Sequence, residues 1–272
     1  MSDADSSLGD RLPAPVVAVA VVVGLVALAF VGGNALAALL GLALSVAGVE
    51  LTPRRAVVLS VLTLQLVAFT AVSVGYLRYR GQTLADIGVR VPSLEGWIAL
   101  GAGYVGMVVL WLSGAIATFV IASRLGIERQ QQGIIEVAQQ DPLIFVLIGV
   151  LSMLIVGPAE ELLFRGIVQS RLRETFGPVV GVGTATLFFA FAHITGFLPG
   201  NIEGALLGVV VLFLVGLVLG VVYEFTENLV VVAVIHGLFN MTQAAFGYIG
   251  VRFGDAETAA VAVRGIAALV GV

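Results

Sequence analysis

The groups best suited to chemistry in this 272-residue chain are its only two histidines and a pair of adjacent glutamates, each next to or inside a long apolar run. They stand in three clusters, Glu160-Glu161-Leu-Leu-Phe-Arg165, Phe189-Ala-Phe-Ala-His193 and His236-Gly-Leu-Phe-Asn240. Carboxylates and imidazoles are the usual groups of general acid–base catalysis. Ionisable groups at membrane depth are costly and usually line a functional cavity. The three clusters therefore predict an active site inside a membrane.

Helix geometry divides the roles within the first cluster. Glu161 and Arg165 are four residues apart with the acid first, which is the orientation that pairs best on a helix. Glu160 is rotated by about 100° from its neighbour and can point into a cavity. Gly157-Pro158, just before, suits a kink or a helix start that opens space there. The alternative interpretation is that these charges mark the surface end of a span.

Each histidine also has two interpretations. A lone histidine such as His193 is more often a packed core residue, but hydrocarbon offers no water to satisfy its imidazole. His236 and Asn240 are four residues apart and share one helix face. Both can donate hydrogen bonds towards one point, as an oxyanion hole requires. The alternative for this pair is hydrogen bonding between packed spans.

The composition identifies the scaffold that must position these clusters. Sixty per cent of the residues are hydrophobic, 11% are charged and the mean hydropathy is +1.12, whereas a soluble domain has about 25% charged residues. Uncharged stretches near or above the roughly 18–20 residues of a membrane span cover 12–49, 56–77, 96–123, 142–159, 175–202, 204–223 and 228–251. We therefore expect an all-α polytopic membrane protein with seven spans, or eight if Gly32-Gly33-Asn34 breaks the first stretch.

The three clusters can form one site only if the fold brings them to the same depth in the membrane. Glu160 lies about 18 residues into its span, His193 about 15 residues after the Gly177-Pro178 turn, and His236 about 8 residues into the last span. The second of these helices runs antiparallel to the first and the third. Tilted or kinked helices are therefore expected.

Several chemistries are excluded by what the chain lacks. It contains no cysteine, which removes thiol nucleophiles, disulfides and thiolate metal ligands. It has no lysine for a Ser–Lys dyad, no Gly-x-Ser-x-Gly elbow and no His-Glu-x-x-His zinc motif. No basic patch suits nucleic acid. A transporter would be expected to show paired broken helices in two related halves, and a non-catalytic membrane scaffold stays open as an alternative.

Taken in order, Glu-Glu-x-x-x-Arg, Phe-x-x-x-His and His-x-x-x-Asn resemble the CPBP family, which comprises CAAX prenyl proteases and bacteriocin-processing (Abi) proteins. The resemblance covers residues 158–240 and implies an intramembrane endopeptidase with a four-helix catalytic core. It implies that Glu160 and His193 activate a water molecule and that His236 and Asn240 hold the oxyanion. It assigns supporting places to Glu161, Arg165 and Phe189.

The remaining expectations follow from the residues and from this resemblance together. No cofactor is expected, and the alternative is a divalent metal such as zinc, held by Glu160, His193 and His236. The substrate is expected to be a membrane-associated protein or peptide, prenylated in the eukaryotic branch of the family, and the location is the plasma membrane. The expected organisation is a polar N-terminus (1–11), N-terminal membrane helices (12–141), the catalytic core (142–250) and a short C-terminal tail (251–272), which is expected to be interfacial from Thr258 to Val272.

Overall fold

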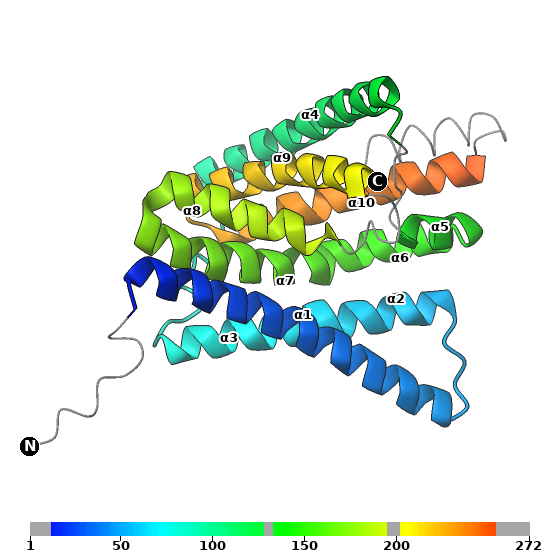
Figure 1. Ribbon diagram of the computed structural model, residues 1–272, viewed down its shortest axis with the longest axis horizontal. Coiled ribbons are helices and arrows are strands. Elements are labelled where there is room, and N and C mark those ends of the chain that lie inside the picture. The colour runs from blue at the N-terminus through cyan, green and yellow to red at the C-terminus, as the bar shows by residue number, and fades with distance from the viewer. Residues whose placement is uncertain (1–11, 128–132, 195–201, 254–272) are drawn as a thin grey trace, which may run out of the picture.

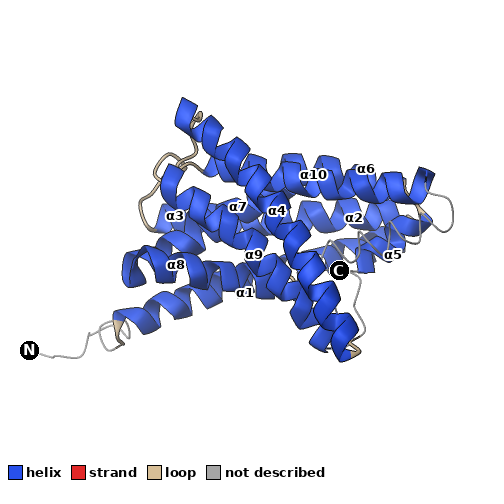
Figure 2. Cartoon of the chain, turned by 90° about the horizontal axis from the view of Figure 1, so that it is seen from above, coloured by secondary structure: helices blue, strands red, loops and turns tan. Residues whose placement is uncertain are grey.

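The fold was obtained as a computed structural model that describes residues 12–127, 133–194 and 202–253. In these ranges the chain is helical, with no strand, and Figures 1 and 2 show long helices packed side by side. The elements are α1 (Ala14–Val46), α2 (Pro53–Val61), η2 (Leu62–Phe69), α3 (Thr70–Tyr79), α4 (Leu94–Leu125), α5 (Gly133–Gln140), α6 (Leu143–Leu151), η3 (Ser152–Val156), α7 (Gly157–Glu161), η4 (Leu162–Gln169), α8 (Ser170–Ala192), α9 (Ile202–Thr226) and α10 (Leu229–Phe253). The η segments are π-helical turns.

Within the described residues, six helical runs are long and apolar enough to cross a membrane. They are Ala14–Val46, Pro53–Tyr79, Leu94–Leu125, Leu143–Ala192, Ile202–Thr226 and Leu229–Phe253. A helix satisfies its backbone polar groups within its own segment, which hydrocarbon requires. The expected all-α, polytopic class is therefore confirmed, and the protein is a multi-pass membrane protein.

The expected count of seven or eight spans is not confirmed. The stretch 142–159 and the part of 175–202 up to Ala192 lie in one helical run, Leu143–Ala192, which continues through the charges at 160–165 and changes direction at Gly177. The first stretch is also unbroken, since α1 passes through Gly32-Gly33-Asn34 as regular helix. The expected interfacial tail, from Thr258 to Val272, lies outside the described residues.

The run Leu143–Ala192 reverses direction at Gly177. This residue has φ 77° and ψ 173°, a backbone conformation that glycine adopts without steric cost, and Pro178 follows it as a favourable first residue of the next helical segment. The returning segment packs closely, because a Cβ at Gly181 would lie 2.7 Å from the Arg173 backbone. The α8 run is thus a tight hairpin whose second arm ends beside the first.

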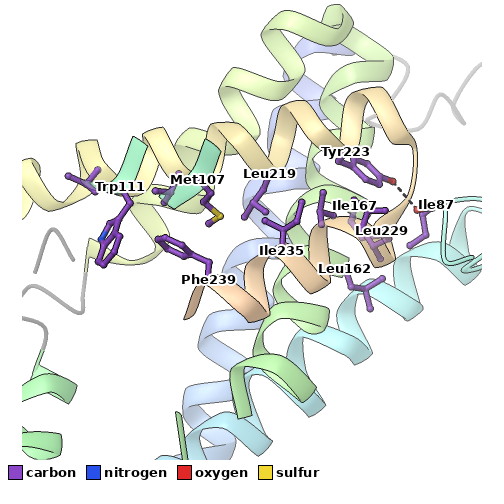
Figure 3. Close-up of a cluster of buried hydrophobic side chains, with 14 of the residues drawn as sticks. Ile87, Met107, Trp111, Leu162, Ile167, Leu219, Tyr223, Leu229, Ile235 and Phe239 are labelled. Atoms are coloured by element: carbon purple, nitrogen blue, oxygen red, sulfur yellow. Dashed lines mark hydrogen bonds between the residues drawn. The ribbon is translucent and has the colours of Figure 1, made fainter. Parts of the chain in front are cut away.

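The largest buried apolar cluster joins α4, α9, α10 and η4 (Figure 3). The Trp111 and Phe239 rings meet edge to face with centroids 5.6 Å apart. At the other end of the cluster, the Tyr223 hydroxyl donates a hydrogen bond to the Ile87 carbonyl at 3.0 Å. The cluster fixes α10, which carries His236, against α4, α9 and η4.

Candidate active site

Glu160 is where the three sequence clusters meet. Its Oε2 lies 3.6 Å from Nε2 of His193 and 3.9 Å from Nε2 of His236. The glutamate is only 5% exposed and its Oε2 has no hydrogen-bond partner among the described residues. The structure thus brings one carboxylate and both imidazoles of the chain to a single buried point.

The hairpin at Gly177 explains how His193 reaches Glu160. Gly177 stands 17 residues after Glu160 and 16 residues before His193, so the two side chains lie at nearly equal distance from the turn. His193 itself follows the last residue of α8, with φ −89° and ψ −5°. Because the two arms of this antiparallel hairpin are nearly equal in length, Glu160 and His193 lie at the same depth.

Two glycines bring α10 to the same depth. A Cβ on Gly237 would lie 2.8 Å from the Met153 Cα, and a Cβ on Gly157 would lie 2.9 Å from the Ala233 carbonyl oxygen. The backbones of α10 and of the η3–α7 segment therefore touch, as small residues permit between membrane helices. This contact places His236, next to Gly237, against Glu160 and Glu161.

His236 is held by a chain of buried charges. Its Nδ1 lies 2.7 Å from Glu161 Oε1, which makes Nδ1 the donor to this carboxylate. The other oxygen, Oε2, lies 3.3 Å from Arg165 Nε. Arg165 also donates from Nη2 to the Gly216 carbonyl at 2.9 Å. Glu161 and Arg165 are 0% and 1% exposed. The His236 imidazole is therefore held in place by buried side chains.

Phe189 packs against both histidines. The Nδ1 of His193 lies 2.7 Å from the Phe189 carbonyl oxygen and donates to it, because a carbonyl can only accept. The Phe189 ring centroid is 4.7 Å from the His193 ring and 5.8 Å from the His236 ring. Arg165 stacks on the same ring at 4.7 Å. Both imidazoles are therefore oriented with Nε2 towards Glu160.

Asn240 lies one helical turn beyond His236 on α10 and is half-buried. The structure shows no hydrogen bond from its side chain to a described residue. Among the described residues, therefore, nothing occupies its amide donor. The described geometry places it on the expected face but does not bring it into contact with Glu160.

Gln65 is a neighbour of Glu160 that the sequence motifs did not identify. It lies on η2, and its Nε2 donates to Glu160 Oε1 at 3.4 Å. The signal for it was an amide in the middle of the uncharged stretch 56–77, although nothing in that stretch showed which face turns inward. Two further π-helical segments, η3 and η4, flank α7 itself, and π-helical turns occur frequently at functional sites.

Glu160, His193 and His236 are the ligands that the zinc alternative would use. Tetrahedral zinc with bonds of about 2.0–2.2 Å holds its ligand atoms about 3.3–3.6 Å apart. The distances from Glu160 Oε2 to the two histidines are 3.6 and 3.9 Å. Within the described residues, no three His, Cys, Asp or Glu side chains are grouped so that they could hold a metal ion.

Residues 142–242 match the model of a protein family described as Rce1-like, type II CAAX prenyl endopeptidase. The matched region contains all three clusters and begins at the start of α6. The family resemblance drawn from the motifs is thereby confirmed over this part of the chain. Searches of curated proteins and of solved structures found no match.

Proposed function

We propose that this protein is an intramembrane endopeptidase of the CAAX type, which hydrolyses a membrane-proximal peptide bond with a water molecule activated by Glu160 and His193. The observation that carries the proposal is the buried Glu160 carboxylate facing both imidazoles at 3.6 and 3.9 Å. The family match over residues 142–242 supports the reaction class. A membrane scaffold would not need its buried acid and base groups gathered at one point.

The hydrogen-bond roles at Glu160 favour a water molecule as the reacting group. In a neutral His193 the proton is on Nδ1, which donates to the Phe189 carbonyl, so Nε2 is an acceptor. Glu160 Oε2 is also an acceptor, and 3.6 Å is too long for a direct hydrogen bond. A water between them would donate one hydrogen to each.

The reaction follows from this arrangement. The water oxygen attacks the carbonyl carbon of the peptide bond while Glu160 takes the proton that the water loses. The carbonyl oxygen becomes the oxyanion of a tetrahedral intermediate. The carbon–nitrogen bond then breaks, and Glu160 returns its proton to the leaving nitrogen. His193 orients the water and shares its hydrogen bonding throughout.

Asn240 and His236 are proposed to donate to the oxyanion. The Nδ1 of His236 already holds a hydrogen for Glu161, so His236 donates through Nε2 only when it carries a second proton. Asn240 donates through its amide whatever the charge of the site. Both donors project from one face of α10, so a carbonyl oxygen held near that face meets both.

Asn240→Ala is expected to lower kcat by about a hundredfold, the usual effect of losing one oxyanion donor. Its effect should be smaller than that of losing Glu160, because His236 remains to stabilise the oxyanion. Steady-state kinetics of the purified variant test this, with Asn34→Ala as the matched control, since Asn34 lies on α1 and donates to its own helix at the Phe30 carbonyl. An unchanged kcat would remove Asn240 from the oxyanion site.

The substrate is proposed to be a membrane-associated protein or peptide at the plasma membrane, and reconstitution tests this directly. The protein in liposomes is incubated with matched peptides that end in a CAAX sequence, prenylated and unprenylated, and the released C-terminal tripeptide is measured by mass spectrometry. We expect release from the prenylated peptide. Cleavage of both peptides equally would leave a protease without lipid selectivity, and cleavage of neither would contradict the CAAX-type activity.

The proposed reaction needs no metal, since Glu160 and His193 suffice to activate water. Cleavage is therefore expected to persist after prolonged treatment with a metal chelator, and the purified protein should contain no stoichiometric zinc by elemental analysis. Full inhibition that is reversed by added zinc, together with zinc in the purified protein, would reject this mechanism in favour of the metal alternative.

A further inference from the structure

We infer that Gln65 is a positioning residue for the reaction, which holds the Glu160 carboxylate so that Oε2 faces the two histidines. The inference rests on the proposed function and extends the site into the N-terminal helices, outside residues 142–242 that match the family model. Gln65 lies 95 residues before Glu160 and contacts it through Nε2 at 3.4 Å from Oε1.

The chemistry of the two side chains fixes which end of the amide faces Glu160. An ionised carboxylate only accepts hydrogen bonds, so the amide nitrogen must be the atom that faces it. The remaining amide oxygen, Gln65 Oε1, is buried and has no hydrogen-bond partner among the described residues. A buried acceptor left without a partner opposes stability. Gln65 is therefore not explained as a group that merely joins two helices.

The backbone around Gln65 is fixed by contacts with α1 and with Thr70. A Cβ on Gly33 would lie 2.8 Å from the Leu64 Cα, so α1 touches the backbone of η2 at the residue before Gln65. The Thr70 hydroxyl donates to the Gln65 carbonyl at 3.4 Å, which occupies a backbone acceptor within the π-helical segment. The side chain of Gln65 thus extends towards Glu160 from a backbone that these contacts hold in place.

This contact fixes the rotation of the carboxylate. Glu160 Oε1 is held by Gln65, and Oε2 consequently points towards Nε2 of His193 and of His236. Without the amide donor, the carboxylate can rotate about its last carbon–carbon bond and leave the water incorrectly placed. Small displacements of a reacting group lower the rate strongly while substrate binding is unaffected. The expected signature is a lower kcat with an unchanged KM.

The test compares Gln65→Met with Leu66→Met in the reconstituted protein. Methionine keeps the length of glutamine but has no donor, and Leu66 is the neighbouring residue, 45% exposed on the outer surface of the helices. We expect Gln65→Met to lower kcat between tenfold and a hundredfold, with KM and thermal stability near those of the wild type. Leu66→Met should match the wild type. A wild-type kcat in Gln65→Met would overturn the inference.

A second measurement is independent of catalysis. Gln65→Met and Glu160→Ala are combined in a double-mutant cycle on the thermal unfolding midpoint in detergent, which isolates the interaction between the two residues. Non-additive midpoints support the contact, and additive midpoints overturn the inference. A coupled pair in a wild-type protein that cleaves no peptide would contradict the proposed function alone. Gln65→Glu, which replaces the donor by a second acid, should lose more activity than Gln65→Met.

Discussion

Glu160→Gln is expected to lower the turnover number by about two to four orders of magnitude, the range associated with loss of a general base. The amide has the shape of the carboxylate but cannot take a proton from the attacking water. Folding should be retained, because a neutral amide at this buried point costs less desolvation than the 5% exposed carboxylate. Kinetics and the unfolding midpoint of the purified variant test both parts.

The same variant can identify substrates in cells. Host cells carrying wild type, Glu160→Gln or the control Glu95→Gln are compared for the C- and N-termini of their membrane proteins. Glu95 is an exposed carboxylate in the first turn of α4, so its amide should behave as wild type. New termini that require Glu160 but not Glu95 would name the substrates. Identical termini in all three strains, at matched expression, would count against a protease and favour a membrane scaffold.

The residues of the C-terminal half could be predicted because charge stands out in apolar sequence. The spacing of Glu161 and Arg165 predicted an ion pair on one helix, and the two side chains lie 3.3 Å apart. Gly177-Pro178 predicted the turn that brings His193 back towards Glu160. Ionisable groups are costly in hydrocarbon and therefore face partners inside the protein. Their positions in the sequence consequently constrain how the helices pack.

The part of the site that the N-terminal helices supply could not be predicted, because no charge marks it in the sequence. Lipid is as apolar as a protein core, so an apolar membrane helix carries no alternation that separates its inner face from its outer face. Nothing in stretch 56–77 indicated that Gln65 faces Glu160, and nothing marked η2 as π-helical. The close approach at Gly157 and Gly237 was also hidden, because glycine is common throughout this chain.

The count of seven or eight spans is not confirmed, because one of the six long apolar runs, Leu143–Ala192, continues through a charged cluster and reverses direction at Gly177. The uncharged stretch ends at 159 because Glu160 follows, whereas the helix runs on through Arg165 to the turn at Gly177. Those charges neutralise one another inside the protein and need no membrane surface. A charged cluster in a long apolar helix therefore marks an interior polar site as readily as an end.

Arg165→Met is expected to destabilise the folded protein by about 3–5 kcal/mol, the usual effect of removing one partner from a buried ion pair. Glu161 is 0% exposed, and without Arg165 its carboxylate keeps only the imidazole of His236. The unfolding midpoint in detergent measures the loss. Arg54→Met is the control, because Arg54 pairs with Asp141 at an exposed position, where an ion pair contributes little.

Removing both charges separates the two roles of this pair. In Glu161→Leu combined with Arg165→Met, no buried charge is left without a partner, and most of the lost stability should return, since apolar replacement of a buried ion pair is often neutral. Cleavage should not return, because His236 Nδ1 has lost the acceptor that lies 2.7 Å away in the wild type. A double variant that cleaves at the wild-type rate would show that Glu161 stabilises the fold without orienting His236. A stable but inactive double variant would place the chain from Arg165 through Glu161 to His236 within the catalytic apparatus.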